Sequence, residues 1–223
     1  DWAGTAVDYG CFAPVAAFME AFAEKGLVID VVQTRKPMGL PKIQHIRELL
    51  SMPEVNGQFV ARYQRAWTEE DVVELNGLFE KHLFASLENY TDPIPGVIPT
   101  LEKLRAEGLK IGSTTGYTRE MMDVVLPAAQ AKGYRVDYCA TPNLLPSGRP
   151  APYMIFENLT KLAVPSLDAV VKVGDTIADI KEGVNAKVWS VGVILGSNEM
   201  ALTEEETRSM PAGELEARIA EGK

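Results

Sequence analysis

Two acidic segments, far apart in the chain, carry the side chains best suited to chemistry. The first reads Asp1-Trp2-Ala3-Gly4-Thr5, an Asp followed by a tight Gly-Thr turn. The second reads Gly174-Asp175-Thr176-Ile177-Ala178-Asp179 and follows an apolar stretch. A carboxylate presented by a turn can act as a nucleophile toward phosphorus, and further aspartates supply the hard oxygen ligands that Mg²⁺ prefers. The two segments together predict a magnesium-assisted aspartyl phosphotransfer site.

The second half of the chain alternates between helix and strand patterns, which predicts how these segments are positioned. We expect helices at residues 97–107, from 119, at 150–162 and from 177, and short strands at 109–114, 136–140, 169–173 and 188–194. Such an alternation is typical of a doubly wound parallel sheet covered on both faces, with its active site at the carboxyl ends of the strands. Asp1, Thr114-Thr115-Gly116 and Gly174-Asp175 each stand where a strand should end. We therefore expect them in one pocket, and we expect that a first strand, leading into Asp1, is missing from this sequence.

The region between these two halves reads as helical throughout. Apolar residues recur at helical spacing in residues 12–25, from about 42 to 50, and in 68–84, with Thr68 as an expected cap. Clustered Pro and Gly at residues 92–96 mark a boundary. We therefore predict a Rossmann-like α/β core domain made of residues 1–10 and 91–223, interrupted by an all-helical cap domain of residues 11–90.

Composition limits the classes of partner. The chain has 223 residues, 46% of them hydrophobic, which suits one domain with a large insertion or two small domains. A net charge of -9 without Lys and Arg clusters argues against nucleic acid or an anionic membrane. No apolar run reaches membrane-spanning length, and Cys11 and Cys139 suggest neither a disulfide framework nor a zinc site. We expect a cytoplasmic protein that acts on a small molecule.

Three segments together resemble one known family. The combination of Asp-Trp-Ala-Gly-Thr, of Arg35-Lys36-Pro37-Met38-Gly39-Leu40-Pro41-Lys42-Ile43-Gln44-His45 and of Gly174-Asp175-Thr176 is similar to the phosphonatase branch of the haloacid dehalogenase superfamily. Most phosphatases of that superfamily carry a second Asp two residues after the nucleophile, as general acid for the leaving oxygen. This chain has Ala3 there, which departs from the phosphatase pattern and agrees with the phosphonatase branch.

The resemblance implies a role for several residues. Asp1 would be the nucleophile, and Mg²⁺ would be bound by the Asp1 and Asp175 side chains with the Ala3 carbonyl. Asp179, one helical turn after Asp175, would hold a water on the metal. The phosphoryl group would be held by Thr115 and the Gly116 backbone.

Further positions match that family's substrate pocket. Arg149 resembles the basic residue that screens charge between nucleophile and phosphoryl group. Met38, Tyr117 and Cys11 match residues that line the pocket, although a Met in a core or a buried inert thiol would give the same pattern.

Lys42 decides the reaction that the resemblance implies. An exposed Lys, with a pKa of about 10.4, is almost fully protonated at pH 7, so a nucleophilic amine needs burial or neighbouring positive charge. His45 lies three residues on, on the same helix face, where it could move protons during imine formation. The implied activity is hydrolysis of the carbon–phosphorus bond of phosphonoacetaldehyde, through a Lys42 Schiff base and an aspartyl phosphate on Asp1.

Two alternatives stay open on the sequence. One is a phosphomonoester phosphatase of the same superfamily, and the other is a truncated relative without activity. The resemblance also implies a homodimer joined through the caps, with which apolar cap residues such as Phe18 and Phe22 are compatible.

Overall fold

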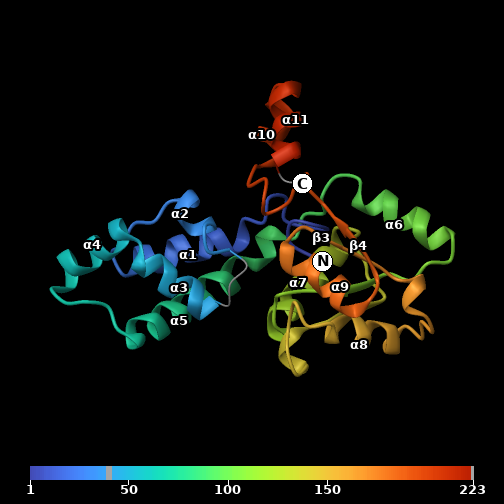
Figure 1. Ribbon diagram of the computed structural model, residues 1–223, viewed down its shortest axis with the longest axis horizontal. Helices are drawn as coiled ribbons and strands as arrows, with labels where there is room; N and C mark the ends of the chain where they lie inside the picture. Colours follow the sequence, from blue (N-terminus) through green and yellow to red (C-terminus); the bar gives the residue numbers. More distant parts are fainter. Residues whose placement is uncertain (39–41, 222–223) are drawn as a thin grey trace. The chain divides into compact units, whose positions relative to one another are not determined.

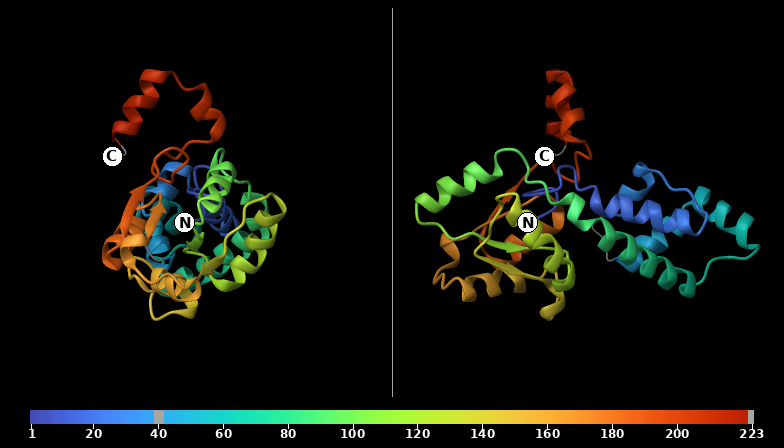
Figure 2. Two further views of the ribbon diagram at one scale, coloured as in Figure 1. Left: turned by 90° about the vertical axis from the view of Figure 1, so that its right-hand side faces the viewer. Right: turned by 180° about the vertical axis from the view of Figure 1, so that it is seen from behind.

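The computed structural model describes residues 1–38 and 42–221, and the chain falls into two compact units. Unit 1 consists of Asp1–Phe12 and Glu88–Lys223, and unit 2 consists of Ala13–Leu87. The domain boundaries predicted from sequence lay after residues 10 and 90. In Figures 1 and 2 the described part of unit 2 contains helices without strands, whereas unit 1 contains both.

Unit 2 is built on three helices that the apolar spacing predicts and two that it does not. Its helices are α1 (Ala13–Glu24), α2 (Val31–Arg35), α3 (Lys42–Ser51), α4 (Pro53–Tyr63) and α5 (Glu69–Ser86). The predictions for α1, α3 and α5 are confirmed. Pro53, which we read only as the end of α3, is also the first residue of α4, where its missing N–H costs nothing. The five residues of α2 are too few for a periodic pattern, and α2 is fixed by a capping box between Asp30 and Gln33.

The core of unit 2 is aliphatic and aromatic, with α1 packed along α5. Phe18 and Phe22 are both 0% exposed within this core. Burying a side chain of this size stabilises a fold by about 1.5–3 kcal/mol. These two residues are therefore packed inside unit 2 and offer no exposed surface to another copy of the chain, and the cap dimer stays a prediction.

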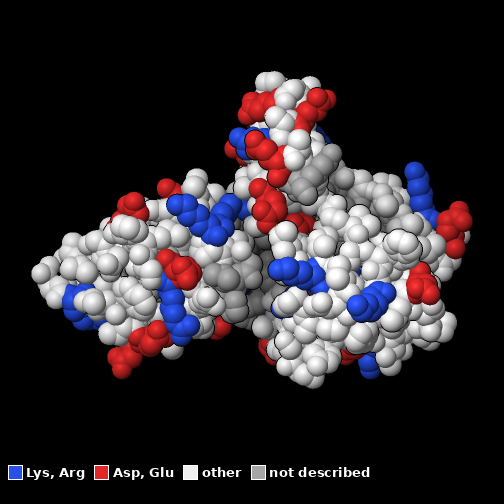
Figure 3. All heavy atoms as spheres, viewed as in Figure 1, with Lys and Arg blue, Asp and Glu red and all other residues white. Residues whose placement is uncertain are grey.

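Unit 1 follows the predicted alternation of helix and strand. Its elements are α6 (Val97–Ala106), β1 (Gly112–Thr114), α7 (Arg119–Ala131), β2 (Tyr138–Ala140), α8 (Tyr153–Lys161), β3 (Val171–Gly174), α9 (Ile177–Ala186), β4 (Trp189–Gly192), α10 (Glu204–Ser209) and α11 (Ala212–Glu221), with short 3-10 turns at Leu87–Tyr90, Pro142–Leu144 and Leu167–Ala169. The α/β class with parallel strands is confirmed. The strands are shorter than predicted, and the last two helices were not predicted. Figure 3 shows acidic side chains over α10 and α11, and three successive glutamates form the first turn of α10.

The sheet of unit 1 is divided into two parallel pairs, where we predicted one continuous sheet. β1 pairs with β2, and β3 pairs with β4, among the described residues. The opening segment provides bonds to both pairs. The Asp1 nitrogen donates a hydrogen bond to the Val173 carbonyl of β3 at 3.0 Å, and the Trp2 indole donates one to the Ser113 hydroxyl of β1 at 3.0 Å. Side-chain and terminal hydrogen bonds of this segment therefore link the pairs, together with the bond from Lys172 of β3 to Thr114 of β1.

Among the described residues, no helix combines the length and the apolar character needed to cross a membrane.

Candidate active site

A glycine turn brings the opening segment against the second acidic segment. Gly4 has a φ of +77°, and a Cβ at this position would collide with the Asp175 carboxylate. Only glycine therefore allows the turn to pass so closely. The Thr5 hydroxyl then donates a hydrogen bond to Asp175 Oδ1 at 2.8 Å, and the Asn198 backbone N–H donates one to Oδ2 at 2.9 Å. Asp175 is thus held by residues on both sides of it in the chain.

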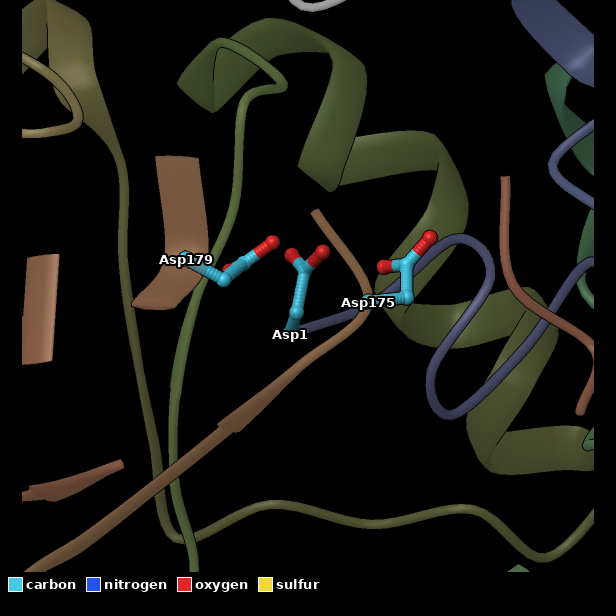
Figure 4. Close-up of side chains that lie close together, drawn as sticks. All are labelled: Asp1, Asp175 and Asp179. Atoms are coloured by element: carbon cyan, nitrogen blue, oxygen red, sulfur yellow. The ribbon is translucent and has the colours of Figure 1, made fainter. Parts of the chain in front are cut away.

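Three carboxylates meet at this point. Asp1, Asp175 and Asp179 each offer an oxygen within 4.8 Å of the others, and in the view of Figure 4 the Asp1 carboxylate lies between the other two. Asp175 is buried, and its burial raises its pKa, against the opposing effect of the bonds from Asn198 and Thr5. A cluster of this kind favours the binding of a cation.

Asp179 differs from the other two in its contacts. It lies in the first turn of α9, where its Oδ2 accepts a hydrogen bond from the Thr176 hydroxyl at 2.6 Å in a capping box. Its Oδ1 lies 2.6 Å from Lys172 Nζ and 2.9 Å from Arg149 Nη1. Burial by itself would raise the pKa of Asp179, but Arg149 and Lys172 outweigh it and lower the pKa. Asp179 is therefore an ionised partner of two cations, and its role in holding a metal-bound water stays a prediction.

Arg149 connects the acidic groups. Its Nη2 donates a hydrogen bond to Asp1 Oδ1 at 2.5 Å and another to the Thr114 hydroxyl at 2.9 Å. The side chain is only 11% exposed. A charge-assisted bond of this length holds the Asp1 carboxylate in a fixed orientation. The structure thus brings together four of the residues singled out from the sequence: Asp1, Arg149, Asp175 and Asp179.

Sequence reasoning missed Lys172 and Glu182 of this cluster, and it placed Thr114 in the pocket without giving it a role. Lys172 is buried on β3, Glu182 is fully buried on α9, and Thr114 ends β1. The Lys172 pKa is lowered by burial and by Arg149, while Asp179 and Glu182 act in the opposite direction. A signal was present for two of them, because Lys172 occupies an inward position of an alternating strand and Glu182 lies three residues after Asp179 on the same helix face.

The loop after β1 carries the residues expected to bind the phosphoryl group. Thr115 is buried, and its Oγ1 accepts a hydrogen bond from the Tyr117 N–H at 3.0 Å, so its hydroxyl proton can be donated elsewhere. Gly116 is exposed, and a Cβ there would meet nothing within 4 Å. Burial raises the pKa of the Tyr117 phenol, with smaller contributions from Asp8 and Cys11. Tyr117 and the half-buried Cys11 therefore lie near each other in unit 1.

Ala3 and Met38 each form a backbone contact. Ala3 lies two residues after Asp1 and forms a bridge with Val7. Met38 is half-buried after α2, and its N–H donates to the Arg35 carbonyl at 3.0 Å. Residues 39–41, which belong to the matched segment before Lys42, lie outside the described residues.

Lys42 begins α3 and lies over aromatic rings. Its Nζ is 5.5 Å from the centre of the Phe18 ring and 5.6 Å from that of Phe79. Phe18 stacks on Phe79 and on His45, with 4.1 Å between ring centres in each case. These four side chains belong to α1, α3 and α5 of unit 2.

His45 is held in one protonation state. Burial, with the neighbouring Lys42 charge, lowers its pKa to about 3, so the ring is neutral at ordinary pH. Its Nε2 is 2.9 Å from the Thr34 carbonyl, which only accepts, so the proton is on Nε2. Nδ1 is buried and has no hydrogen-bond partner among the described residues. Nδ1 is therefore the ring nitrogen that keeps its lone pair.

The carboxylates of unit 1 fit the magnesium ion that the resemblance implies. Asp1 and Asp175 offer hard oxygen ligands within the 4.8 Å cluster, and their mutual repulsion would be relieved by a divalent cation. Both oxygens of Asp175 accept one bond each, which leaves further lone pairs for a metal. Asp1 and Asp175 are thus the side chains that would hold it.

Comparison with known proteins identifies relatives along the whole chain. The haloacid dehalogenase-like hydrolase family matches residues 12–193. A phosphonoacetaldehyde hydrolase of Bacteroides fragilis is 87% identical over 223 residues, which is 100% of this chain and 85% of the relative. A phosphonoacetaldehyde hydrolase of Parabacteroides distasonis is 64% identical over 218 residues, which is 97% of this chain and 83% of the relative.

A solved structure agrees with these relatives. The crystal structure of a phosphonoacetaldehyde hydrolase-like protein from Oleispira antarctica has a TM-score of 0.89 and 34% sequence identity. The match covers 100% of this chain and 80% of that one.

Proposed function

The chain belongs to the haloacid dehalogenase-like hydrolases, within their phosphonoacetaldehyde hydrolase branch, and we propose that it cleaves phosphonoacetaldehyde into acetaldehyde and phosphate. It is a hydrolase of carbon–phosphorus bonds. The observation that carries the proposed mechanism is the placement of an amine, Lys42, on aromatic rings beside a neutral histidine.

Carbon–phosphorus cleavage poses a different problem from ester cleavage. The leaving group of a phosphate ester is an oxygen, which a nearby acid can protonate. The leaving group of a phosphonate is a carbanion, which an oxygen acid does not help. An iminium next to that carbon accepts the electron pair and becomes an enamine. Ala3 in place of a second Asp is consistent with a reaction that needs no oxygen acid.

The proposed reaction proceeds through two covalent intermediates. The Lys42 amine condenses with the aldehyde, releasing water and forming an iminium. An Asp1 oxygen attacks phosphorus, and the electron pair of the broken carbon–phosphorus bond forms the enamine. The enamine takes up a proton at carbon, and water then hydrolyses the imine to acetaldehyde and free Lys42. A second water cleaves the aspartyl phosphate to phosphate and regenerates Asp1.

His45 is suited to the proton transfers of imine formation. With its proton fixed on Nε2 by Thr34, its Nδ1 would take up a proton from the condensing amine only transiently, because its pKa is about 3, and would pass it to the departing hydroxyl. This transfer takes place one helical turn from Lys42 on α3.

The groups of unit 1 support the attack on phosphorus. Arg149 Nη2 holds Asp1 Oδ1 and screens charge between the carboxylate and an anionic phosphoryl group. The Thr115 hydroxyl and the Gly116 N–H are the proposed donors to that group. A magnesium ion bound by Asp1 and Asp175, with the Ala3 carbonyl, would neutralise negative charge on the phosphoryl oxygens.

Reductive trapping tests the imine. The protein is incubated with phosphonoacetaldehyde and borohydride, and the modified residue is identified by mass spectrometry. The expected label is on Lys42. Lys25 is a matched control from the same unit, because it is paired with Glu74 at 2.7 Å and should carry no label.

Substitution provides the second test. Lys42→Arg keeps a positive charge but cannot form an imine, and it should abolish acetaldehyde release, whereas Lys25→Arg should not. Near-normal carbon–phosphorus cleavage by Lys42→Arg would refute the imine. Release of phosphate from simple phosphate esters, without cleavage of phosphonoacetaldehyde, would point to the phosphomonoester phosphatase instead.

The assembly of the protein stays a prediction. A homodimer joined through the caps, implied by the family resemblance, is tested by sedimentation equilibrium of the purified protein.

A further inference from the structure

Glu182 is a buried carboxylate that has no role in the proposed reaction. It lies on α9, three residues after Asp179, and both side chains are 0% exposed. Its Oε2 lies 3.3 Å from Lys172 Nζ and 3.3 Å from Arg149 Nε. A carboxylate buried this completely is unfavourable unless cations and donors compensate it, so its position needs an explanation.

The Thr114 hydroxyl fixes the direction of the surrounding hydrogen bonds. Its Oγ1 lies 3.0 Å from Lys172 Nζ and 2.9 Å from Arg149 Nη2, and both of these groups can only donate. The hydroxyl proton must therefore point to Glu182 Oε2, 3.0 Å away. One arrangement of protons satisfies all three bonds.

Arg149 meets a carboxylate on each edge of its guanidinium group. Nη2 bonds to Asp1, Nη1 lies 2.9 Å from Asp179, and Nε faces Glu182. Nε and Glu182 Oε1 are both buried and have no hydrogen-bond partner among the described residues. Nε therefore meets Glu182 Oε2 as an ion pair at 3.3 Å and not through a hydrogen bond. Glu182 thus lies against the Nε edge of the guanidinium, while Nη2 is bonded to Asp1.

We propose that Glu182 is a positioning residue, which acts through Arg149 and sets the guanidinium for binding the phosphoryl group at Asp1. Lys172 balances the charge of Glu182 and Asp179, and Thr114 links the two cations to Glu182. This proposal rests on the proposed function, in which Arg149 screens the attack of Asp1. A competing explanation is that Glu182 only neutralises Lys172, in which case it would affect stability and leave anion binding unchanged.

Binding of inorganic phosphate in the presence of Mg²⁺ separates the two explanations. Glu182→Gln keeps the shape of the side chain and removes its charge, and it should weaken phosphate binding at least about tenfold by calorimetry. The matched control is Glu102→Gln, an exposed glutamate on α6 of the same unit, which should change the affinity less than about twofold. Wild-type affinity in a folded Glu182→Gln protein would overturn the proposal.

A double-mutant cycle tests whether Glu182 acts through Arg149. In an Arg149→Lys background the planar fork is already lost, so adding Glu182→Gln should weaken phosphate binding by less than about threefold. If Glu182→Gln costs the same factor in both backgrounds, Glu182 acts independently of Arg149 and the proposal fails.

Thr114 provides a test that does not depend on how Glu182→Gln folds. Thr114→Val is nearly isosteric and removes the shared hydroxyl, so it should weaken phosphate binding. Thr114→Ser should recover most of the affinity that Thr114→Val loses. A Thr114→Val protein with wild-type affinity would contradict the proposal.

These assays do not require carbon–phosphorus cleavage. A wild-type protein that releases no acetaldehyde would refute the proposed function while the phosphate-binding comparison still stands. A wild-type protein that binds no phosphate would overturn the present proposal.

Discussion

Two lysines of this protein lie in opposite surroundings. Lys172 of unit 1 is 2.6 Å from one carboxylate and 3.3 Å from another, and the Thr114 hydroxyl accepts its hydrogen bond. Lys42 of unit 2 lies over the rings of two phenylalanines beside a neutral imidazole. Lys172 is thus an ion-pair partner within unit 1, whereas Lys42 is the proposed nucleophile of unit 2.

The two ammonium groups differ in the chemical groups near them, which are carboxylates for Lys172 and aromatic rings for Lys42. The carboxylates of Asp179 and Glu182 favour the charged form of Lys172 and oppose burial and Arg149, which lower its pKa. An aromatic face stabilises a cation by only about 0.5–2 kcal/mol. The groups that surround a lysine can therefore suit it either to imine formation or to a place in an ion-pair cluster near an anion site.

The largest effect is expected from the nucleophile of unit 1. Asp1→Asn should lower acetaldehyde and phosphate release by more than about a thousandfold, because an amide cannot attack phosphorus. Borohydride trapping on Lys42 should nevertheless persist, since imine formation uses unit 2. Loss of both turnover and trapping in a folded Asp1→Asn protein would contradict the proposal that imine formation at Lys42 does not depend on Asp1.

Metal removal should also separate the two chemistries. Chelation with EDTA should abolish turnover, and Mg²⁺ should restore it, while trapping of Lys42 continues in the absence of metal. Asp175→Asn should raise the Mg²⁺ concentration for half-maximal activity by at least about tenfold, because one anionic ligand is lost. Asp168→Asn, at an exposed position of unit 1, is the control. Full activity in EDTA would exclude a metal role.

The neutral histidine should make stability depend on pH. The pKa of His45 is about 3 in the folded chain and near 6.5 ordinarily, so between these values the unfolded state binds the extra proton. Its contribution to stability is complete above about pH 6.5 and is lost as the pH falls toward 3, by up to about 1.4 kcal/mol per pH unit.

Urea unfolding at pH 5, 6, 7 and 8, followed by circular dichroism, measures this dependence. His45→Phe keeps an aromatic ring against Phe18 but does not titrate, and its stability should fall less between pH 6 and 5. The two proteins should have parallel curves from pH 7 to 8. Equal slopes below pH 6.5 would show that His45 is not the group responsible.

The smallest expected effects come from a matched pair of helix caps. Thr68 precedes α5 of unit 2 and donates to Asp71, and Thr176 precedes α9 of unit 1 and donates to Asp179. Replacing either Thr by Ala should lower the free energy of unfolding by about 1 kcal/mol. Only Thr176→Ala should also weaken phosphate binding, because Asp179 contacts Arg149. An equal change in phosphate affinity for both variants would remove the distinction between the units.

Much of the local structure could be predicted from the sequence. The apolar spacing predicts α1, α3 and α5, the alternation of elements predicts the parallel strands, and the expected cap at Thr68 is confirmed. Pro53 was misread because the same residue both ends one helix and begins the next. The short helix α2 and the C-terminal helices α10 and α11 give too weak a periodic signal.

The candidate site could be predicted only in part. Asp1, Asp175 and Arg149 were found because they belong to a recognisable pattern. Lys172 and Glu182 belong to no such pattern, and each became significant only through Arg149, Asp179 and Thr114.

The sequence by itself determined the element types, the glycine turn at Gly4 and the identity of the reactive side chains. These features depend on neighbours within a few positions, through backbone sterics, capping and side-chain spacing. The tertiary structure alone decided which charges meet. Arg149 lies 148 positions from Asp1, Thr114 lies 68 positions from Glu182, and Thr5 lies 170 positions from Asp175. The strength of an electrostatic interaction depends on the distance between the charges and on their burial, and the spacing of residues along the sequence gives neither quantity.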